Sequence, residues 1–304
     1  MSPVLAFLML TGLVAAGSYI TAVLDRAAAG ALGAAGGGST FLAPLRTAAA
    51  TLATQRITTE RPDALLWFLA PVSYLALALI GLTVVPFGPS LVVTDLSSGI
   101  VVWGMCESLV VIAVFMHGWA ANSPLALIGA YRYVAIGLPV MLISMFVLIA
   151  AALPAQSLAV TDIVASQEDV WNVARQPLGL PLFLLLGLSL TLRGPFDYAD
   201  SPDLCGGTTV EVSGPGRAAW QLARLAMLVS FSAMAATVFL GGYLGPWLPG
   251  PVWVVLKTLL LLAVLVVLDK LFALMPPSRM LTLVWVVLLP LAFLDLVIAG
   301  IEAL

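Results

Sequence analysis

Long apolar runs alternate with short polar connectors along the 304 residues of the chain. A helix needs about 20 apolar residues to cross a hydrocarbon core of roughly 30 Å, and eight runs approach that length. They cover residues 4–24, 64–86, 97–118, 127–152, 177–193, 217–242, 251–272 and 279–303. The pattern predicts an all-α polytopic membrane protein with eight transmembrane helices in a single integral membrane domain, residues 1–304.

Two connectors contain segments that are too polar or too short to span. In "TFLAPLRTAAATLATQRI", residues 40–57, apolar side chains are set against Arg46 and Gln55, which predicts either a helix lying flat at the membrane interface or an ordinary packed helix. The preceding "AAAGALGAAGGGS" is too glycine-rich for a firm helix. The segment "SLAVTDIVASQEDVWNVARQ", residues 157–176, is expected along the outer surface. One or two short interfacial helices are therefore predicted.

Composition supports the membrane assignment and excludes several partners. At 62% hydrophobic and 9% charged residues, the chain has too much apolar surface for a water-soluble globule. Its net charge of −3 does not indicate a nucleic-acid partner. Two cysteines and one histidine, His117, supply no ligand set for an iron–sulfur cluster, haem or zinc. We therefore expect the chain to bind no metal cofactor, and any redox metal to lie in another subunit.

The distribution of basic residues predicts the orientation in the membrane. Connectors on one side contain Arg26, Arg46, Arg56, Arg61, Arg193, Arg217, Lys270 and Arg279, whereas the connectors on the other side contain only Arg175. By the positive-inside rule, both termini of this multi-pass protein of the cell inner (plasma) membrane face outward. The acidic hairpin "LRGPFDYADSPDLCGGTTVEVSG", residues 192–214, then faces the cytoplasm.

The hairpin resembles a loop of a known family. Its order of Arg193, Pro195, Phe196 and Asp197, then Asp200 and "EVSG" at 211–214, resembles "R-x-PFDL-x-E…E-x-SG" in the membrane H subunit, or subunit 1, of complex I. Membrane anchor subunits of energy-converting [NiFe] hydrogenases (group 4) and formate hydrogenlyases share this loop. Three further segments match in register: "GWAANSPLALIGAYR" at 118–132, "ATVFLGGYLGPWLPGPVWVVLKTL" at 236–259 and "LLPLAFLDL" at 288–296.

The resemblance implies eight helices and a subunit that anchors a peripheral electron-transfer arm to antiporter-like, proton-translocating membrane subunits. Iron–sulfur and nickel–iron centres are then expected only in peripheral partner subunits, with lipid around the helices. Arg193, Asp197, Asp200 and Glu211 are the coupling-loop residues that match the motif. A carboxylate near the membrane surface suits coupling, because its surroundings shift its pKa. Docking alone is the rival role of this loop, and a diverged ion transporter or assembly scaffold without redox coupling is the alternative function.

The sequence departs from the family pattern in the signature for quinone binding and in the acidic residues of the proton path. The basic quinone-loop signature "Q-x-R-x-GPN-R-x-G" is missing after Asp25 and Arg26, which puts electron transfer to quinone in doubt. The intramembrane glutamate of the family falls on Met141, and Arg224 stands where an acid is expected. The missing signature favours the hydrogenase-like branch slightly, although "GWAANS" and "LGGYLGP" look closer to the quinone-linked members. Both branches stay open.

Charged residues inside the predicted spans form a second candidate site. Each costs about 2.5–3.5 kcal/mol at a helix centre, so such residues normally pair or line a hydrated cavity. The set is Glu107, Arg132, Arg224, Lys257 and Asp295. Arg132 and Arg224 are expected to snorkel to the interface, and His117 to be interfacial. We hypothesise that Glu107, balanced by one of the cations, replaces the acid absent at 141 in a polar track from the hairpin toward the antiporter-like neighbours; a static buried ion pair is the alternative.

Overall fold

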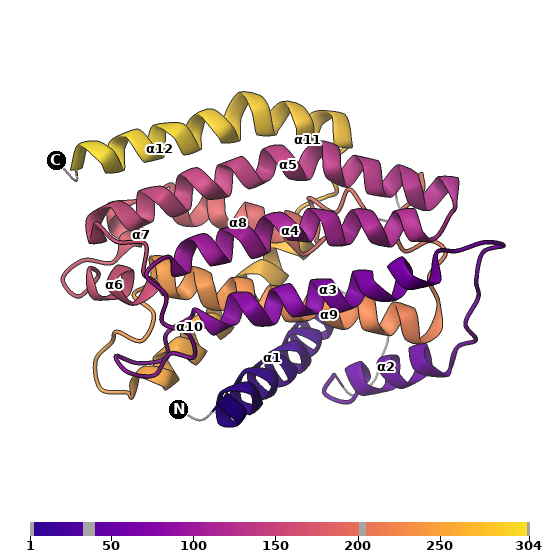
Figure 1. The fold of residues 1–304 in the computed structure, drawn as a ribbon, viewed down its shortest axis with the longest axis horizontal. Helices are drawn as coiled ribbons and strands as arrows, with labels where there is room; N and C mark the ends of the chain where they lie inside the picture. Colours follow the sequence, from indigo (N-terminus) through magenta and orange to yellow (C-terminus); the bar gives the residue numbers. More distant parts are fainter. Residues whose placement is uncertain (1–2, 33–39, 201–204, 303–304) are drawn as a thin grey trace.

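The computed structural model describes residues 3–32, 40–200 and 205–302. Within these ranges the helices long and apolar enough to cross a membrane number seven, and no strand is formed. The long helices are α1 (Pro3–Ala31), α3 (Ala64–Thr83), α4 (Gly99–Ala120), α5 (Pro124–Ala152), α9 (Gly214–Phe239), α10 (Gly250–Leu271), and α11 (Pro277–Leu283), which continues through a π-helical turn (Val284–Leu288) into α12 (Leu289–Glu302) (Figure 1). The prediction of an all-helical polytopic membrane fold is confirmed.

The fifth predicted span, residues 177–193, forms a shorter helix than expected. Helix α8 (Gly179–Leu190) has 12 residues, about 18 Å at 1.5 Å per residue, which is less than the hydrocarbon core. The chain leaves the helix at Leu192, whose φ is 54°, and stays buried there. Neighbouring helices enclose this irregular backbone, which is the condition under which it is tolerated at membrane depth.

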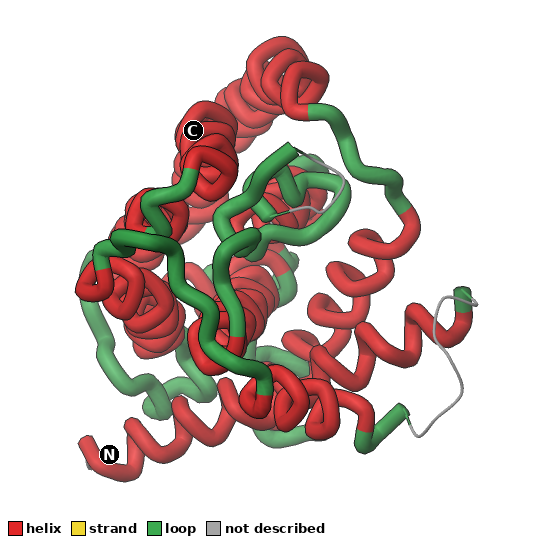
Figure 2. Tube along the Cα trace, turned by 90° about the vertical axis from the view of Figure 1, so that its right-hand side faces the viewer, coloured by secondary structure: helices red, strands yellow, loops and turns green. Residues whose placement is uncertain are grey.

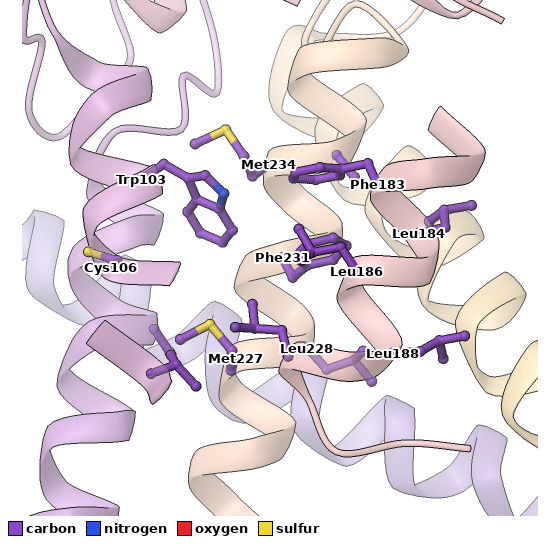
Figure 3. Packing of buried hydrophobic residues seen from close by; sticks show 14 of the residues in the cluster. Trp103, Cys106, Phe183, Leu184, Leu186, Leu188, Met227, Leu228, Phe231 and Met234 are labelled. Atoms are coloured by element: carbon purple, nitrogen blue, oxygen red, sulfur yellow. The ribbon is translucent and has the colours of Figure 1, made fainter. Parts of the chain in front are cut away.

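Helix α9 is the centre of the bundle. It contacts α1, α3, α8 and α10 and is buried along most of its length. Figure 3 shows Phe231 of α9 between Trp103 of α4 and Phe183 of α8. The ring centroids of Phe231 lie 4.4 Å from Phe183 and 6.2 Å from Trp103. This ring packing fixes the rotation of α9 about its axis. It therefore also fixes the direction in which the polar side chains of α9 face the loops.

The connector segments form short helices. Helix α2 (Ala43–Ala53) buries none of its residues and has exposed Phe41, Leu42 and Leu45 at its start. Residues 27–31 belong to α1, so this part of the low-complexity piece is helical, contrary to expectation, because alanine is a strong helix former; residues 33–39 lie outside the described ranges. Helices α6 (Val160–Ala165) and α7 (Asn172–Arg175), with the 3₁₀ turn Leu153–Ala155 before them, pack against the bundle.

Connectors that are far apart in the sequence meet at one end of the bundle. Ile57 N–H donates to Ser213 Oγ at 2.7 Å, Thr59 Oγ1 donates to Ala121 O at 2.7 Å, and Met275 N–H donates to Pro195 O at 3.1 Å. Figure 2 looks onto this end, where loops cross over the helices. We call it the hairpin end. The opposite, distal end holds α6, α7, the start of α1 and the end of α12 (Figure 1).

Candidate functional site

Arg224 of α9 is the centre of the site at the hairpin end. Its Nε donates to Thr191 O at 3.2 Å and Nη2 donates to Leu192 O, the backbone carbonyls of the two buried residues that follow α8. Nη1 lies 3.5 Å from Asp200 Oδ2, and Nη2 lies 4.0 Å from Asp197 Oδ2. Acceptors within the protein therefore hold the guanidinium of Arg224, and 23% of its side chain stays exposed.

Asp200 is almost completely buried, with 2% of its side chain exposed. Trp220 Nε1 donates to its Oδ2 at 3.1 Å, and Thr208 Oγ1 donates to its Oδ1. His117 stacks on Trp220 with ring centroids 3.8 Å apart and is 1% exposed, so it is a core residue and not the interfacial histidine expected. Asp200 therefore has a full set of partners and little access to solvent.

Asp197 is the more accessible of the two carboxylates. Its side chain is 17% exposed, and its Oδ1 accepts a hydrogen bond from the backbone N–H of Asp200 at 2.9 Å. Burial raises the pKa of Asp197 to about 6, against the lowering effect of Arg224. A group with this pKa changes its charge slightly below neutral pH. Asp203 of the same hairpin lies outside the described residues.

Arg193 makes a separate network. Its Nη1 and Nη2 donate to the two carboxylate oxygens of Asp25, each at 2.7 Å, and Nη1 also lies 3.5 Å from Asp269 Oδ2. Asp269 Oδ1 accepts from Gly194 N–H at 2.7 Å, and Oδ2 accepts from Lys270 at 2.7 Å. These contacts join α1, the hairpin and the end of α10. Sequence reasoning missed these partners of Arg193.

The far arm of the hairpin packs on the start of α5. Arg132 donates to Cys205 O at 2.7 Å and to Gly206 O. A Cβ added at Gly129 would lie 2.7 Å from both Ala199 O and Thr208 N, so only glycine fits there. Ser123 Oγ donates to Glu211 Oε1 at 2.8 Å. Glu211 thus binds at the N-terminus of α5, apart from Asp197.

A cavity of about 650 Å³ opens beside the network, between α1, α2, α9 and the first arm of the hairpin. Its charged wall consists of Asp25, Arg26, Arg193, Asp197, Arg224, Asp269 and Lys270, and α2 supplies small side chains opposite. Asp200 and Glu211 are absent from the described lining. Of the hairpin carboxylates that the structure describes, Asp197 is therefore the one that lines this cavity.

Glu107 is deep in the bundle. Its Oε2 accepts from Ser144 Oγ of α5 at 2.6 Å, and its Oε1 accepts no hydrogen bond from the described residues. Ser144 lies one helical turn beyond Met141, so the Glu107 carboxylate reaches α5 close to the position of the missing family glutamate. Within the described ranges, Glu107 has no basic group within 4.0 Å, so the expected ion pair with Arg132, Arg224 or Lys257 is not formed.

Lys257 and Asp295 belong to the distal half of the bundle. Lys257 Nζ donates to the carbonyls of Leu240, Gly242 and Leu244 at 2.6, 2.9 and 2.6 Å, beyond the C-terminus of α9. Asp295 Oδ2 accepts a hydrogen bond from Gln176 Nε2. The structure therefore brings Arg224 to the hairpin acids but joins neither Lys257 nor Asp295 to Glu107.

The chain is similar to known proteins over most of its length. A family model described as NADH dehydrogenase matches residues 4–300. The H 1 subunit of NADH-quinone oxidoreductase from Rhodopseudomonas palustris strain HaA2 is 35% identical over 240 residues, 79% of this chain and 75% of the relative. The H 1 subunit of strain BisA53 is 34% identical over 78% of this chain and 75% of the relative, and the H 2 subunit of strain ATCC BAA-98 / CGA009 is 33% identical over 79% and 75%.

The family match covers all four motifs on which the sequence resemblance rests, and the helices follow in the order that the resemblance implies. The alignments cover 78–79% of this chain and 75% of each relative, which is more than a shared pattern of apolar segments would explain. The resemblance to the complex I membrane subunit is therefore confirmed: the chain belongs to the NADH dehydrogenase family that includes the H subunits of NADH-quinone oxidoreductase.

Proposed function

We propose that this chain is the membrane anchor and coupling subunit of a complex I-related oxidoreductase. In this role it links a peripheral electron-transfer arm to proton-translocating membrane subunits and catalyses nothing alone. The observation that carries the proposal is the position of Asp197, a carboxylate with a raised pKa on the wall of the cavity and in the ion-pair range of Arg224.

The network suits transmission of a redox event. Protonation of Asp197 removes one of the two negative charges that share Arg224, and Arg224 then interacts more strongly with Asp200. The same guanidinium holds the carbonyls of Thr191 and Leu192. A change of charge at Asp197 is thereby passed to the end of α8 and to α9. Such a local electrostatic change is the usual origin of a switch.

The hairpin end is proposed to face the cytoplasm, with both termini outside. Peripheral iron–sulfur and catalytic subunits then dock at the hairpin end, and antiporter-like membrane subunits contact the apolar outer faces of the helices. The charged wall and the small side chains of α2 give the cavity room for a quinone head group. The names of the relatives support the quinone-linked branch over the hydrogenase-linked branch.

Co-purification tests the branch and the alternative function. Mass spectrometry of the solubilised complex should detect iron–sulfur subunits together with antiporter-like subunits. NADH-oxidising subunits would place it in the quinone branch, and a nickel–iron subunit in the hydrogenase branch. A chain that purifies alone and moves ions in liposomes would overturn the proposal in favour of a transporter.

The variant Asp197→Asn separates coupling from docking. Its amide retains the shape and the acceptor for Asp200 N–H but cannot change charge. We expect the complex to assemble and to transfer electrons with proton pumping reduced. Asp162→Asn, which alters an exposed carboxylate bound by Ser157 Oγ on the distal side, is the control. Normal pumping by an assembled Asp197→Asn complex would leave docking as the only role of the hairpin.

The polar track is proposed in a shorter form than the sequence suggested. Glu107 and Ser144 bridge α4 and α5, and Arg132 and Arg224 lie nearer the hairpin, whereas Lys257 and Asp295 are left out of it. Glu107→Gln keeps the acceptor for Ser144 and removes the titratable group. Loss of pumping with intact electron transfer is expected. Unchanged pumping would assign Glu107 the static role of holding α4 to α5.

A further inference from the structure

A second cavity, of about 260 Å³, lies at the distal end of the bundle, between α1, α10 and the connector that joins α3 to α4. Figure 1 shows the start of α1 and the start of α10 side by side at this end, and the two helices are in contact. The described residues that line the cavity are all apolar, and they come from the starts of both helices and from residues 87–93. We call it the apolar cavity, because the cavity at the hairpin end has a charged wall instead.

The rim of the apolar cavity belongs to the outer surface of two membrane-spanning helices. Met9 of α1 and Val255 of α10 line the cavity and are exposed. Leu8 and Val252, beside them, extend the same exposed apolar surface. Both helices are long and apolar enough to cross a membrane. The cavity is therefore continuous with the faces that α1 and α10 turn toward the hydrocarbon of the bilayer.

The connector presents apolar side chains to the cavity and pairs its backbone polar groups within itself and with α3. Phe87 N–H donates to Leu91 O at 2.8 Å, and Leu91 N–H donates to Gly88 O at 3.1 Å. Thr94 N–H donates to Thr83 O at 3.1 Å. Irregular backbone is tolerated at membrane depth where its polar groups are satisfied by protein. This wall is therefore suited to contact with a hydrocarbon chain.

The loop before α10 marks the level of the membrane surface. Trp247 is 99% exposed, and its φ of 69° lies in a region that side chains of this size rarely adopt. Trp253 Nε1 donates to Pro246 O at 3.1 Å and holds the loop against α10. Tryptophan is enriched where lipid headgroups meet hydrocarbon. Because α10 runs from this loop into the bilayer and contributes Pro251 and Val255 to the lining, the apolar cavity lies at the level of the acyl chains.

The charge beside the apolar cavity discriminates between lipid headgroups. A Cβ added at Gly250 would lie 3.1 Å from Phe87 O, so the connectors 84–98 and 240–249 meet at the start of α10. The sequence of these two connectors contains one charged residue, Asp95, and no basic residue. Basic clusters are what attract anionic lipids. A headgroup without net charge is therefore favoured at this place.

We propose that the apolar cavity binds one acyl chain of a zwitterionic phospholipid, whose headgroup lies at the level of Trp247. Water does not fill a cavity without polar partners, and an empty cavity loses the dispersion contacts of its walls. A hydrocarbon chain supplies these contacts and joins α1 and α10 to the connector. The site is separate from the coupling network and does not depend on the function proposed for the hairpin end.

Photolabelling of the purified complex in lipid nanodiscs tests the site. The probe is a phosphatidylethanolamine with a diazirine in one acyl chain, which loses nitrogen on irradiation and leaves a carbene that inserts into a nearby C–H bond. Mass spectrometry of peptides should place adducts on residues 91–93. Labelling of the exposed face of α10 without labelling of residues 91–93 would overturn the proposal.

The same measurement tests the headgroup. A phosphatidylglycerol that carries the diazirine in the same chain should label residues 91–93 several-fold less than the phosphatidylethanolamine. Equal labelling by the two probes would overturn the assignment of a zwitterionic lipid.

Two variants fill the apolar cavity from opposite walls. Leu13→Phe and Val255→Phe each place a ring in the cavity, and each should reduce labelling of residues 91–93 several-fold without changing the labelling of Leu260, which is exposed on α10. Leu260→Phe enlarges a side chain that is absent from the described lining and should label residues 91–93 as the wild type does. Because the walls are filled separately, one variant that fails to assemble leaves the other to decide. Labelling of 91–93 that an assembled filled variant does not reduce would show that lipid reaches the connector from outside the cavity, and would overturn the proposal.

Discussion

The two ends of the bundle satisfy their buried charges in different ways. At the hairpin end charged side chains pair with one another, as Arg193 does with Asp25 and Arg224 with Asp200. At the distal end Lys257 is bound by three backbone carbonyls, and Asp295 by a neutral amide. The first arrangement responds when one member of a pair gains a proton. The contacts of Lys257 are fixed by the fold, since backbone carbonyls cannot change charge.

The difference shows why burial alone does not identify a coupling residue. Lys257 and Glu107 are about equally buried, at 3% and 1% exposure, and the sequence pattern predicted both in one track. Lys257 has carbonyl acceptors for its ammonium protons, and its Nζ lies 4.5 Å from the Trp171 ring. It caps the C-terminal end of α9, where a positive charge is favourable. The partners of a charge, more than its depth, decide its role.

The largest effect is expected when the centre of the hairpin network is removed. Arg224→Met leaves Asp197 and Asp200 without their cation and the carbonyls of Thr191 and Leu192 without their donor. Breaking a buried ion pair on one side costs about 3–5 kcal/mol. The thermal unfolding midpoint of the solubilised complex should fall, or assembly should fail. Arg217→Gln, at the exposed start of the same helix, is the control and should behave as wild type.

A smaller effect is expected from the corresponding change at the distal end. Lys257→Met retains the length of the side chain but leaves the carbonyls of Leu240, Gly242 and Leu244 without a donor. We expect a loss of about 2–3 kcal/mol in the free energy of unfolding, from unsatisfied buried acceptors. Hydrogen exchange should rise in residues 240–249 and stay unchanged in the hairpin. Faster exchange at the hairpin would show that the two ends are not independent.

Lys270→Met is the matched control for Lys257→Met. Lys270 pairs with Asp269 at 2.7 Å but is 36% exposed. Exposed ion pairs contribute roughly 0–1 kcal/mol. A Lys270→Met effect as large as that of Lys257→Met would contradict the assigned difference between carbonyl-bound and solvent-screened lysines.

The smallest effect concerns the pH dependence at the hairpin end. The pKa of Asp197 is raised from 3.8 to about 6, so the folded state binds this proton more tightly than the unfolded state. The resulting stabilisation is complete below about pH 4 and is lost as the pH rises through 6. With its partial exposure, we expect about 1–2 kcal/mol. Melting of the wild type and Asp197→Asn across this window measures it.

The direction in which stability changes with pH tests this prediction for Asp197. Stability of the wild type relative to Asp197→Asn should fall from pH 4 to pH 7. A relative stability that rises over this window would mean that Arg224 lowers the pKa of Asp197 more than burial raises it. Lys257→Met should show the wild-type pH profile, because the carbonyl-bound lysine lies at the other end.

The helices were predictable because their signal is local. A run of about 20 apolar residues identifies a span without any knowledge of its neighbours. Helix α8 was predicted too long because apolar residues continue past Leu190, and only the packed structure shows that Leu192 has left the helix. The hairpin was found through its motif, whereas the position of Asp197 on the wall of a cavity emerged only with the fold.

The partners of the site residues were not predictable, because they are distant in sequence. Arg193 and Asp25 are 168 residues apart, and no local pattern specifies that they meet. Gln176 lies in a short polar connector without a recognisable motif, so its contact with Asp295 emerged only with the fold. The carbonyls of the hairpin and of the end of α8 that hold Arg132 and Arg224 lie between 32 and 74 residues away in the sequence, so no local pattern indicates them.

The close backbone contact between the hairpin and α5 at Gly129 has a mechanical consequence. At Gly129 the backbones approach so closely that not even a methyl group fits between them. Because no free space remains at this contact, the hairpin cannot shift sideways unless the first turns of α5 move with it. If a partner subunit docks on the hairpin as proposed, a displacement of the hairpin is therefore passed to α5 as rigid-body movement.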